Sequence, residues 1–298
     1  MTRILDTYGS DLADLTGAAL VEAIRASEGR TVLAKIVSSS PPLLAGTSNA
    51  ELVAAFGADL VCLNLVDPSM DGTLVTGLER LDPPPDGFSG LARLLGRPVG
   101  LNLEPPLESV PAEFRCDERN LRAAAESGAA FVMVTANPGR DVSTADVGHA
   151  VETVRSSTPE ILCLAGKMHA AGYEERLDAD AARALIESGA QGVLVPVPGT
   201  VPGIDHAAAA AMVAAARDAG ALAVGVIGTS QEGADAATVA SLALEAKRAG
   251  VDIHHIGDAG YSGIADPANI YSYSVAIRGK RHTWNRMARG VRASWKGG

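Results

Sequence analysis

The sequence predicts an α/β fold, a single (β/α)₈ TIM barrel that takes up almost the whole chain. The first observation is a repeated phrase in which an Ala-rich amphipathic run ends at a glycine and an apolar run follows, as in FGADLVCLN from Phe56. A left-handed glycine ends a helix, and a wholly apolar run is typical of a strand buried in a parallel sheet. The second observation is size, since 298 residues with 47% hydrophobic and 4% aromatic content suit one barrel. The clearest helix-ending glycines are Gly57, Gly128, Gly189, Gly220 and Gly250.

Eight apolar runs follow one another along the chain. The first and third belong to variants of the common phrase, EGRTVLAKIV from Glu28 and LGRPVGLNLE from Leu95, and the fifth follows a proline instead, in PEILCLAGKMH from Pro159. An open doubly wound sheet is the alternative, but eight regular units without a Gly-x-Gly-x-x-Gly fingerprint favour a closed barrel. The expected strands are 31–38, 60–66, 97–104, 131–136, 160–167, 192–197, 222–228 and 252–257.

Three segments stand outside the repeats of this single domain, 1–298. Residues 1–30 are expected to form an N-terminal helical cap, with an extra helix from Leu15 to Ser27 that either plugs the barrel or simply packs against it. The connection after strand 2 contains three consecutive prolines and is either a lid or an inert insertion. Residues 279–298 lack carboxylates and predict a basic helical tail.

Charge and cysteine content restrict the partners and the compartment. A net charge of −10 argues against nucleic acid or an anionic membrane as the main partner. Cys62, Cys116 and Cys163 are dispersed and predict buried thiols without a disulfide. No run approaches the roughly 20 apolar residues of a membrane span, and no signal peptide is recognisable, so we expect a cytoplasmic protein. Trp284 and Trp295 in the basic tail suggest packing or the contact of a homo-oligomer.

Polar residues collect at the carboxyl ends of the expected strands, where barrels of this type carry their chemistry. A carboxylate, an ammonium group and imidazoles that converge on one mouth are costly to bury without a function. The predicted catalytic residues are Glu104, Lys167, His169, His255 and Asp258. The predicted substrate-binding residues are Asn64, Asn102, Asn137, Gly199, Thr200, Gly228, Thr229, Ser230, Gly260, Tyr261 and Ser262.

Two of these residues are expected to carry the reaction. Glu104 stands directly before two prolines, a rigid exit that holds its carboxylate near the strand end, which favours a general acid/base over a loop anchor. Lys167 ends an apolar strand, where desolvation favours the neutral amine of a base or a Schiff base, although binding of an anion is an equal alternative. Lys35 interrupts the apolar run of strand 1 and points either into the barrel or outward.

A metal site is the alternative use of the same side chains. Glu104, His169, His255 and Asp258 would supply the ligands, with Mg²⁺ as the ion, if strands 3, 5 and 8 converge. The sequence has neither His-Glu-x-x-His nor Cys-x-x-Cys spacing, so no cofactor is expected. His254 is adjacent to His255 on a strand, so only one of the two faces the barrel interior.

The glycine-rich strand ends point to the ligand. The segments after strands 7 and 8, GVIGTSQEGAD and GDAGYSGIADP, offer backbone N–H groups and hydroxyls before a helix start. Phosphate often binds at these two loops in such barrels, which predicts a small phosphorylated substrate. The alternative is that the glycines only form tight turns.

Five segments carry a resemblance to known proteins: PPLLAGTSNAE at 41–51, RPVGLNLEP at 97–105, AGKMHAAG at 165–172, GTVPG at 199–203 and IHHIGDAGYSG at 253–263. Together they resemble one bacterial protein family whose members are labelled phosphoenolpyruvate phosphonomutase-like or haloacid-dehalogenase-like hydrolase. The mutase label implies a barrel, Mg²⁺ and a phosphorylated carboxylate, but its acidic metal cluster is not matched residue by residue. The hydrolase label implies an Asp-x-Asp-x-Thr/Val nucleophile motif, which Asp6-Thr7-Tyr8 does not match.

Together these features predict an enzyme that acts on a small phosphorylated metabolite of sugar-like structure. Acid/base or Schiff-base chemistry at the barrel mouth fits an isomerase, an epimerase or an aldolase. One alternative is an Mg²⁺-dependent lyase or mutase. The other is a barrel that binds a metabolite without turning it over.

Overall fold

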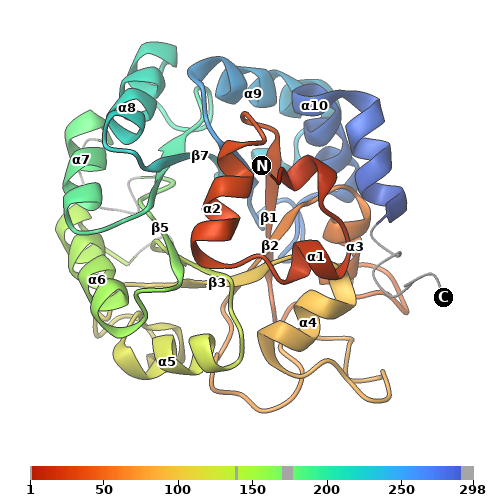
Figure 1. The fold of residues 1–298 in the computed structure, drawn as a ribbon. Helices are drawn as coiled ribbons and strands as arrows, with labels where there is room; N and C mark the ends of the chain where they lie inside the picture. The colour runs from red at the N-terminus through yellow and green to blue at the C-terminus, as the bar shows by residue number, and fades with distance from the viewer. Residues whose placement is uncertain (1, 138–139, 170–176, 290–298) are drawn as a thin grey trace.

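The protein is a closed barrel of eight parallel strands in chain order, β1 to β8, enclosed by helices (Figure 1). This computed structural model describes residues 2–137, 140–169 and 177–289. Each strand pairs with the next, and β8 pairs with β1, so the predicted TIM barrel is confirmed. The strands are β1 (Thr31–Val37), β2 (Leu60–Asn64), β3 (Val99–Leu103), β4 (Phe131–Val134), β5 (Leu162–Ala165), β6 (Gly192–Pro196), β7 (Leu222–Ile227) and β8 (Ile253–Ile256).

Most helices between consecutive strands begin at a residue whose side chain caps the helix. Ser48 and Ser143 form capping boxes at the starts of α3 and α6, and Asp235 caps α9. The helices are α1 (Ser10–Ala13), α2 (Gly17–Arg25), α3 (Asn49–Ala55), α4 (Gly87–Leu95), α5 (Glu118–Glu126), α6 (Thr144–Ser157), α7 (Ala179–Glu187), α8 (His206–Asp218), α9 (Ala236–Ala249) and α10 (Pro267–Arg289), with short 3₁₀ turns η1 (Ile4–Asp6), η2 (Ala112–Phe114) and η3 (Gln231–Gly233).

The apolar core has two parts, one on each side of the strand cylinder. The outer part lies between strands and helices and contains Val32, Ala34 and Ile36 of β1. The inner part fills the barrel and contains Leu33 of the same strand. Because both faces of each strand are buried, the strands read as continuous apolar runs instead of alternating ones.

The N-terminal segment plugs the amino-terminal end of the barrel. Ile4, Leu12, Leu20 and Ile24 are buried in the same apolar cluster as the barrel interior. In Figure 1, helices α1 and α2 lie over the strands at the centre of the ring of helices. The expected helix therefore forms as α2, and of the two alternatives it takes the plugging one.

The helix of the basic tail begins earlier than expected, because α10 starts at Pro267 and is interrupted at Gly279, where φ is 73°. Two of its arginines are buried instead of solvated, since Arg278 and Arg286 both contact the buried carboxylate of Asp59. Residues 290–298, with Trp295, lie outside the described residues.

The described tryptophan of the tail, Trp284, is 54% exposed and donates a hydrogen bond from Nε1 to the Tyr271 hydroxyl at 3.0 Å.

The three cysteines, Cys62, Cys116 and Cys163, are all buried and form no disulfide, as expected. In the residues that the structure covers, no helix combines the length and the apolar character that crossing a bilayer requires.

Candidate active site

Inward-facing polar side chains stand at the carboxyl ends of β1 to β4. In β1, Leu33 faces the interior and the intervening residues face the helices, so alternation turns Lys35 inward. The same alternation brings Asn64, Asn102, Glu104 and Thr135 inward at the ends of the next strands, and all are at most 3% exposed. The strand ends thus place an amine, a carboxylate and neutral polar groups around one mouth.

Three of these side chains, together with Asn137 after β4 and Asp258 after β8, form one connected chain of polar contacts that we call the mouth network. Asn137 donates to Glu104 twice, from its backbone N at 3.0 Å and from Nδ2 at 2.8 Å. Asn64 Nδ2 donates to Asn137 Oδ1 at 3.3 Å and to Asp258 Oδ2 at 2.7 Å. Lys35 Nζ lies 3.9 Å from Asp258 Oδ2 and completes the chain.

Several polar atoms in or next to the mouth network are buried without a hydrogen-bond partner among the described residues. Asn64 Oδ1, Asn102 Oδ1 and Thr135 Oγ1 are among them, on three successive strands. A buried polar atom without a partner costs on the order of 1–3 kcal/mol. Two of the three are pure acceptors, so the group that would satisfy them is a hydrogen-bond donor such as a hydroxyl.

His255 is the histidine that faces the interior. It pairs in register with Leu33 and Val226, two residues of the inner cluster, and neither ring nitrogen has a hydrogen-bond partner among the described residues. Burial lowers its pKa well below 6.5, and the charge of Lys35 lowers it further. Its neighbour His254 faces outward, where Nε2 donates to Gly29 O at 3.0 Å and Nδ1 accepts from the Tyr273 hydroxyl at 3.2 Å.

His169, at the end of β5, is close enough to the site to sense its charges. Burial lowers the pKa of His169, and the positive charges of Lys35 and Lys167 lower it further. Lys167 itself is 4% exposed and donates a hydrogen bond from Nζ to Val142 O at 2.7 Å. Its amine is therefore engaged by the connection between β4 and α6.

A carboxyl group that the sequence analysis missed, Glu232, lies beneath the loops after β7 and β8. Its side chain is fully buried, and neither carboxyl oxygen has a hydrogen-bond partner among the described residues. Oε1 occupies the space that a Cβ at Gly257 would need, so only glycine fits there. Burial raises the pKa of Glu232, and the Asp258 carboxylate adds to the rise.

The glycine-rich loops after β7 and β8 lie side by side. A Cβ at Gly233 would come within 2.6 Å of Gly260 O, so the two backbones are in close contact. Ser230, Tyr261 and Ser262 are exposed on the outside of these loops. The loop after β6 joins them, because the Thr229 hydroxyl donates to Thr200 O at 2.7 Å. Gly199 and Gly228 stand in the same three loops.

The expected metal ligands do not form a metal centre in the described part of the chain. No group of three or more His, Cys, Asp or Glu side chains there is placed to hold an ion. Both carboxylate oxygens of Glu104 already accept hydrogen bonds from Asn137, and Arg140 Nε lies 3.6 Å from one of them. Arg140, which sequence reasoning also missed, therefore balances the Glu104 charge.

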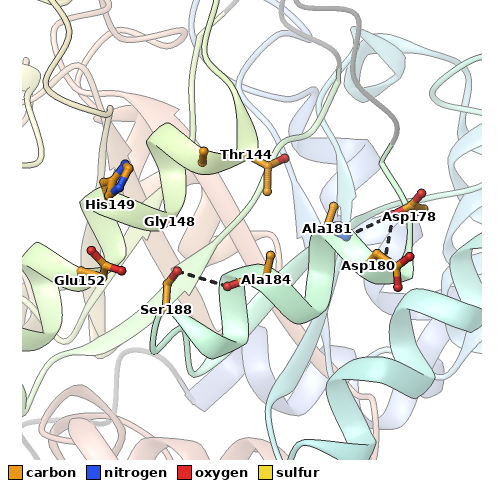
Figure 2. A pocket seen from close by; sticks show the side chains of 10 residues that line it. Thr144, Gly148, His149, Glu152, Asp178, Asp180, Ala181, Ala184 and Ser188 are labelled. Atoms are coloured by element: carbon orange, nitrogen blue, oxygen red, sulfur yellow. Dashed lines mark hydrogen bonds between the residues drawn. The ribbon is translucent and has the colours of Figure 1, made fainter.

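Two surface hollows lie at different distances from the mouth network, one between two outer helices and one beside the mouth. A hollow of about 560 Å³ runs between α6 and α7, where Asp178 caps α7 and Ser188 bonds to Ala184 O (Figure 2). A second, of about 660 Å³, lies over the ends of β1 to β3 and is lined in part by residues 73–76. The connection after β2, expected to be a lid or an insertion, is thus next to the mouth, and Thr76 N donates to Ser38 O at 3.0 Å.

Solved structures resemble this chain in fold. A Rubisco-like protein from Rhodopseudomonas palustris matches with a TM-score of 0.51 and 15% identity, over 86% of this chain and 67% of its own. A Schiff-base-forming fructose-1,6-bisphosphate aldolase matches with a TM-score of 0.50 and 14% identity, over 84% and 93%. At such identities these matches show the barrel fold alone.

The sequence comparisons give a family and no activity. No curated protein matches the chain. The resemblance to phosphoenolpyruvate phosphonomutase-like proteins is not tested by these matches and stays a prediction. One family model covers residues 5–293, and its description is "Domain of unknown function (DUF7916)". Because that match spans nearly the whole sequence, the chain belongs to the DUF7916 family.

Proposed function

We propose that the protein is an enzyme that moves protons on a small hydroxylated carbonyl metabolite bound at the barrel mouth. The observation that carries this proposal is the mouth network, in which side chains from five strands connect the Glu104 carboxylate to the Lys35 amine. Barrel packing alone does not require charged and polar side chains to converge from five strand ends, and burying such groups is costly unless each is paired and hydrogen-bonded. Isomerase, epimerase and aldolase reactions all begin with this kind of proton transfer.

In this reaction Glu104 is the general acid/base. The two hydrogen bonds from Asn137 fix its carboxylate, and Arg140 balances its charge. The side-chain oxygens of Asn64 and Asn102, which have no partner among the described residues, accept hydrogen bonds from substrate hydroxyls and so orient a sugar-like molecule. Asp258, which accepts a hydrogen bond from Asn64, is the second carboxylate of the proposed site beside Glu104.

The phosphate of the substrate belongs, in this proposal, at the outer rim of the loops after β7 and β8. The exposed Ser230, Tyr261 and Ser262 supply hydroxyl donors there, at the place where barrels of this type bind phosphate. The close approach of Gly233 to Gly260 supports the assignment because it places the two loops next to each other.

The proposed reaction uses side chains of the protein alone, without a cofactor. The proposed macromolecular partner is a second copy of the chain.

Deuterium exchange in D₂O tests the proton transfer even where the final product is unidentified. Dihydroxyacetone, dihydroxyacetone phosphate and glyceraldehyde 3-phosphate are incubated with the protein, and exchange next to the carbonyl is followed by proton NMR. Glu104→Gln should slow exchange by about 10²–10⁴-fold, the usual contribution of a general acid/base. The phosphorylated probes should exchange faster than dihydroxyacetone if the rim binds phosphate.

Glu126→Gln is the matched control, because Glu126 is exposed at the end of α5 and should exchange substrate protons like the wild type. Unaltered exchange in Glu104→Gln would contradict the assignment of Glu104. Saturable binding of the probes with no exchange at all would instead indicate a barrel that binds a metabolite without turning it over.

A further inference from the structure

Lys35 is a buried lysine inside the barrel, at a position where packing of the barrel interior calls for an apolar side chain. Its side chain lies in β1 opposite Cys62 of β2 and is 5% exposed. A buried ammonium group is costly unless it is fully paired. In the described part of the chain it makes no hydrogen bond, and its nearest carboxylate oxygen is 3.9 Å away on Asp258.

Lys35 lies among several titratable side chains of the candidate active site. Its charge acts on His169, His255 and Glu232, three titratable side chains from three different strand ends. The imidazole of His255 is buried beside it with both nitrogens unpartnered among the described residues. Lys35 therefore lies where the side chains of the candidate active site meet.

The other described lysines are used differently. Lys167 donates to Val142 O at 2.7 Å, and Lys247 donates to Ile277 O on the outside of the barrel. Lys280 is exposed, with Nζ 5.9 Å from the centre of the Trp284 ring. Of these described amines, the amine of Lys35 is the one that faces the barrel interior, where the proposed substrate binds.

We propose that Lys35 is the nucleophilic amine of the site and forms an iminium with the carbonyl carbon of a small hydroxylated aldehyde or ketone. The inference rests on the proposed function, because it takes that substrate as given. The sequence suggests Lys167 as the Schiff-base amine, and the inference assigns this role instead to Lys35, which faces the barrel interior.

The step balances without a cofactor. Asp258 takes one proton from the Lys35 ammonium, the free amine attacks the carbonyl carbon, and a carbinolamine forms. The proton returns to the departing hydroxyl, which leaves as water, and the Nζ–C bond becomes a C=N bond. An ammonium and a carbonyl thus give an iminium and one water, with the positive charge kept.

Reductive trapping on the full-length chain tests this inference. The protein is incubated with glycolaldehyde or dihydroxyacetone phosphate and cyanoborohydride, whose hydride converts an iminium to a stable secondary amine. Peptide mass mapping then assigns adducts among only five lysines, Lys35, Lys167, Lys247, Lys280 and Lys296. We expect the adduct on Lys35 to form at least ~10-fold faster than on the exposed Lys280, against the order of exposure.

Three variants sharpen the result. Lys35→Met should lose the rapid adduct, Lys167→Met should keep it, and Asp258→Asn should slow it by about tenfold because the proton acceptor is gone. Labelling in the order of exposure, or labelling first at Lys167, would overturn the inference, and the wild-type measurement alone decides this if a variant does not fold.

The two proposals fail separately. If Lys35→Met exchanges substrate protons at the wild-type rate, the iminium is overturned and the acid/base function stands. If Lys35 is labelled rapidly while Glu104→Gln exchanges normally, the iminium stands and the role of Glu104 fails.

Discussion

Glu232 is a carboxyl group whose surroundings favour its protonated form. It is fully buried beside Asp258, behind the close contact with Gly257. A carboxyl group with a raised pKa in the folded chain stabilises the fold most below its unfolded pKa, near 4.5, and loses that contribution as pH rises through the folded value. The loops after β7 and β8 should therefore loosen as pH rises.

Replacement of Glu232 by Gln removes this pH dependence. The free energy of unfolding of the wild type, relative to Glu232→Gln, should fall as pH rises from about 4.5, by up to about 1.4 kcal/mol per pH unit. Urea titrations between pH 4.5 and 8 measure the difference, with the exposed Glu126→Gln as control. A difference that stays constant or grows with pH would show that Glu232 is ionised in the fold.

At the residue scale, the sequence located the mouth but not every side chain in it. The strand-end positions of Glu104, Asn64, Asn137 and Asp258 predict their place in the mouth, and the structure joins them by hydrogen bonds. The sequence does not determine which way Lys35 points, because a barrel strand is apolar on both faces and shows no alternation that identifies the inward residues. The sequence does not reveal Glu232 either, because this residue follows β7 by five positions in a segment whose recognisable signal is its glycines.

At the scale of elements, a buried ionic cluster fastens α10 to the amino-terminal end of the barrel. Asp59, directly before β2, contacts Arg278 and Arg286, and Arg286 Nε lies 2.6 Å from Asp59 Oδ1. Arg286 also donates to Thr7 O at 2.9 Å and to Ile4 O in the N-terminal plug. Arg97 is buried nearby, where burial lowers its pKa to about 9. One carboxylate thus holds several elements together.

Loss of the Asp59 carboxylate should be costly because it leaves buried guanidinium groups without a counter-charge. Asp59→Asn should lower the free energy of unfolding by about 3–5 kcal/mol. Asp180→Asn, which breaks an exposed ion pair with Arg183 on α7, should change it by less than about 1 kcal/mol. Denaturant unfolding of both variants checks the contrast, and equal effects would refute a stabilising role for the cluster.

Elements were more predictable than side-chain contacts. All eight strands lie within the expected ranges, because each apolar run and its helix stop are local signals. The start of α10 at Pro267 and the burial of Arg278 do not follow from the sequence, because the basic composition of the tail predicts a solvated helix. That burial depends on Asp59, 219 residues away in the sequence, which no local pattern reveals.

At the scale of the whole molecule, the barrel has one weak seam. β5 and β6 are joined by two residue pairs, Leu164 with Gly192 and Ala165 with Val193, whereas β6 and β7 are joined by five. With fewer paired residues and a glycine at the contact, fewer interactions are lost when β5 and β6 separate. The closed barrel should therefore open first between β5 and β6.

Native-state hydrogen exchange measures this opening. Amides of β5 should exchange through local opening at a free energy below that of global unfolding, and amides of β7 should exchange only with the global transition. Low concentrations of denaturant separate the two processes. Identical exchange free energies for both strands would show that the barrel opens as one cooperative unit.

The contact between Asn64 and Asp258 also has a consequence for synthesis of the chain, since the two residues are 194 positions apart. At roughly 5–20 residues per second, a ribosome makes Asp258 on the order of 10–40 s after Asn64. During that interval Lys35 has been made but Asp258, its proposed proton acceptor, has not. In the proposed mechanism the nascent chain therefore lacks a complete reactive centre until the residues that follow the last strand, β8, are translated.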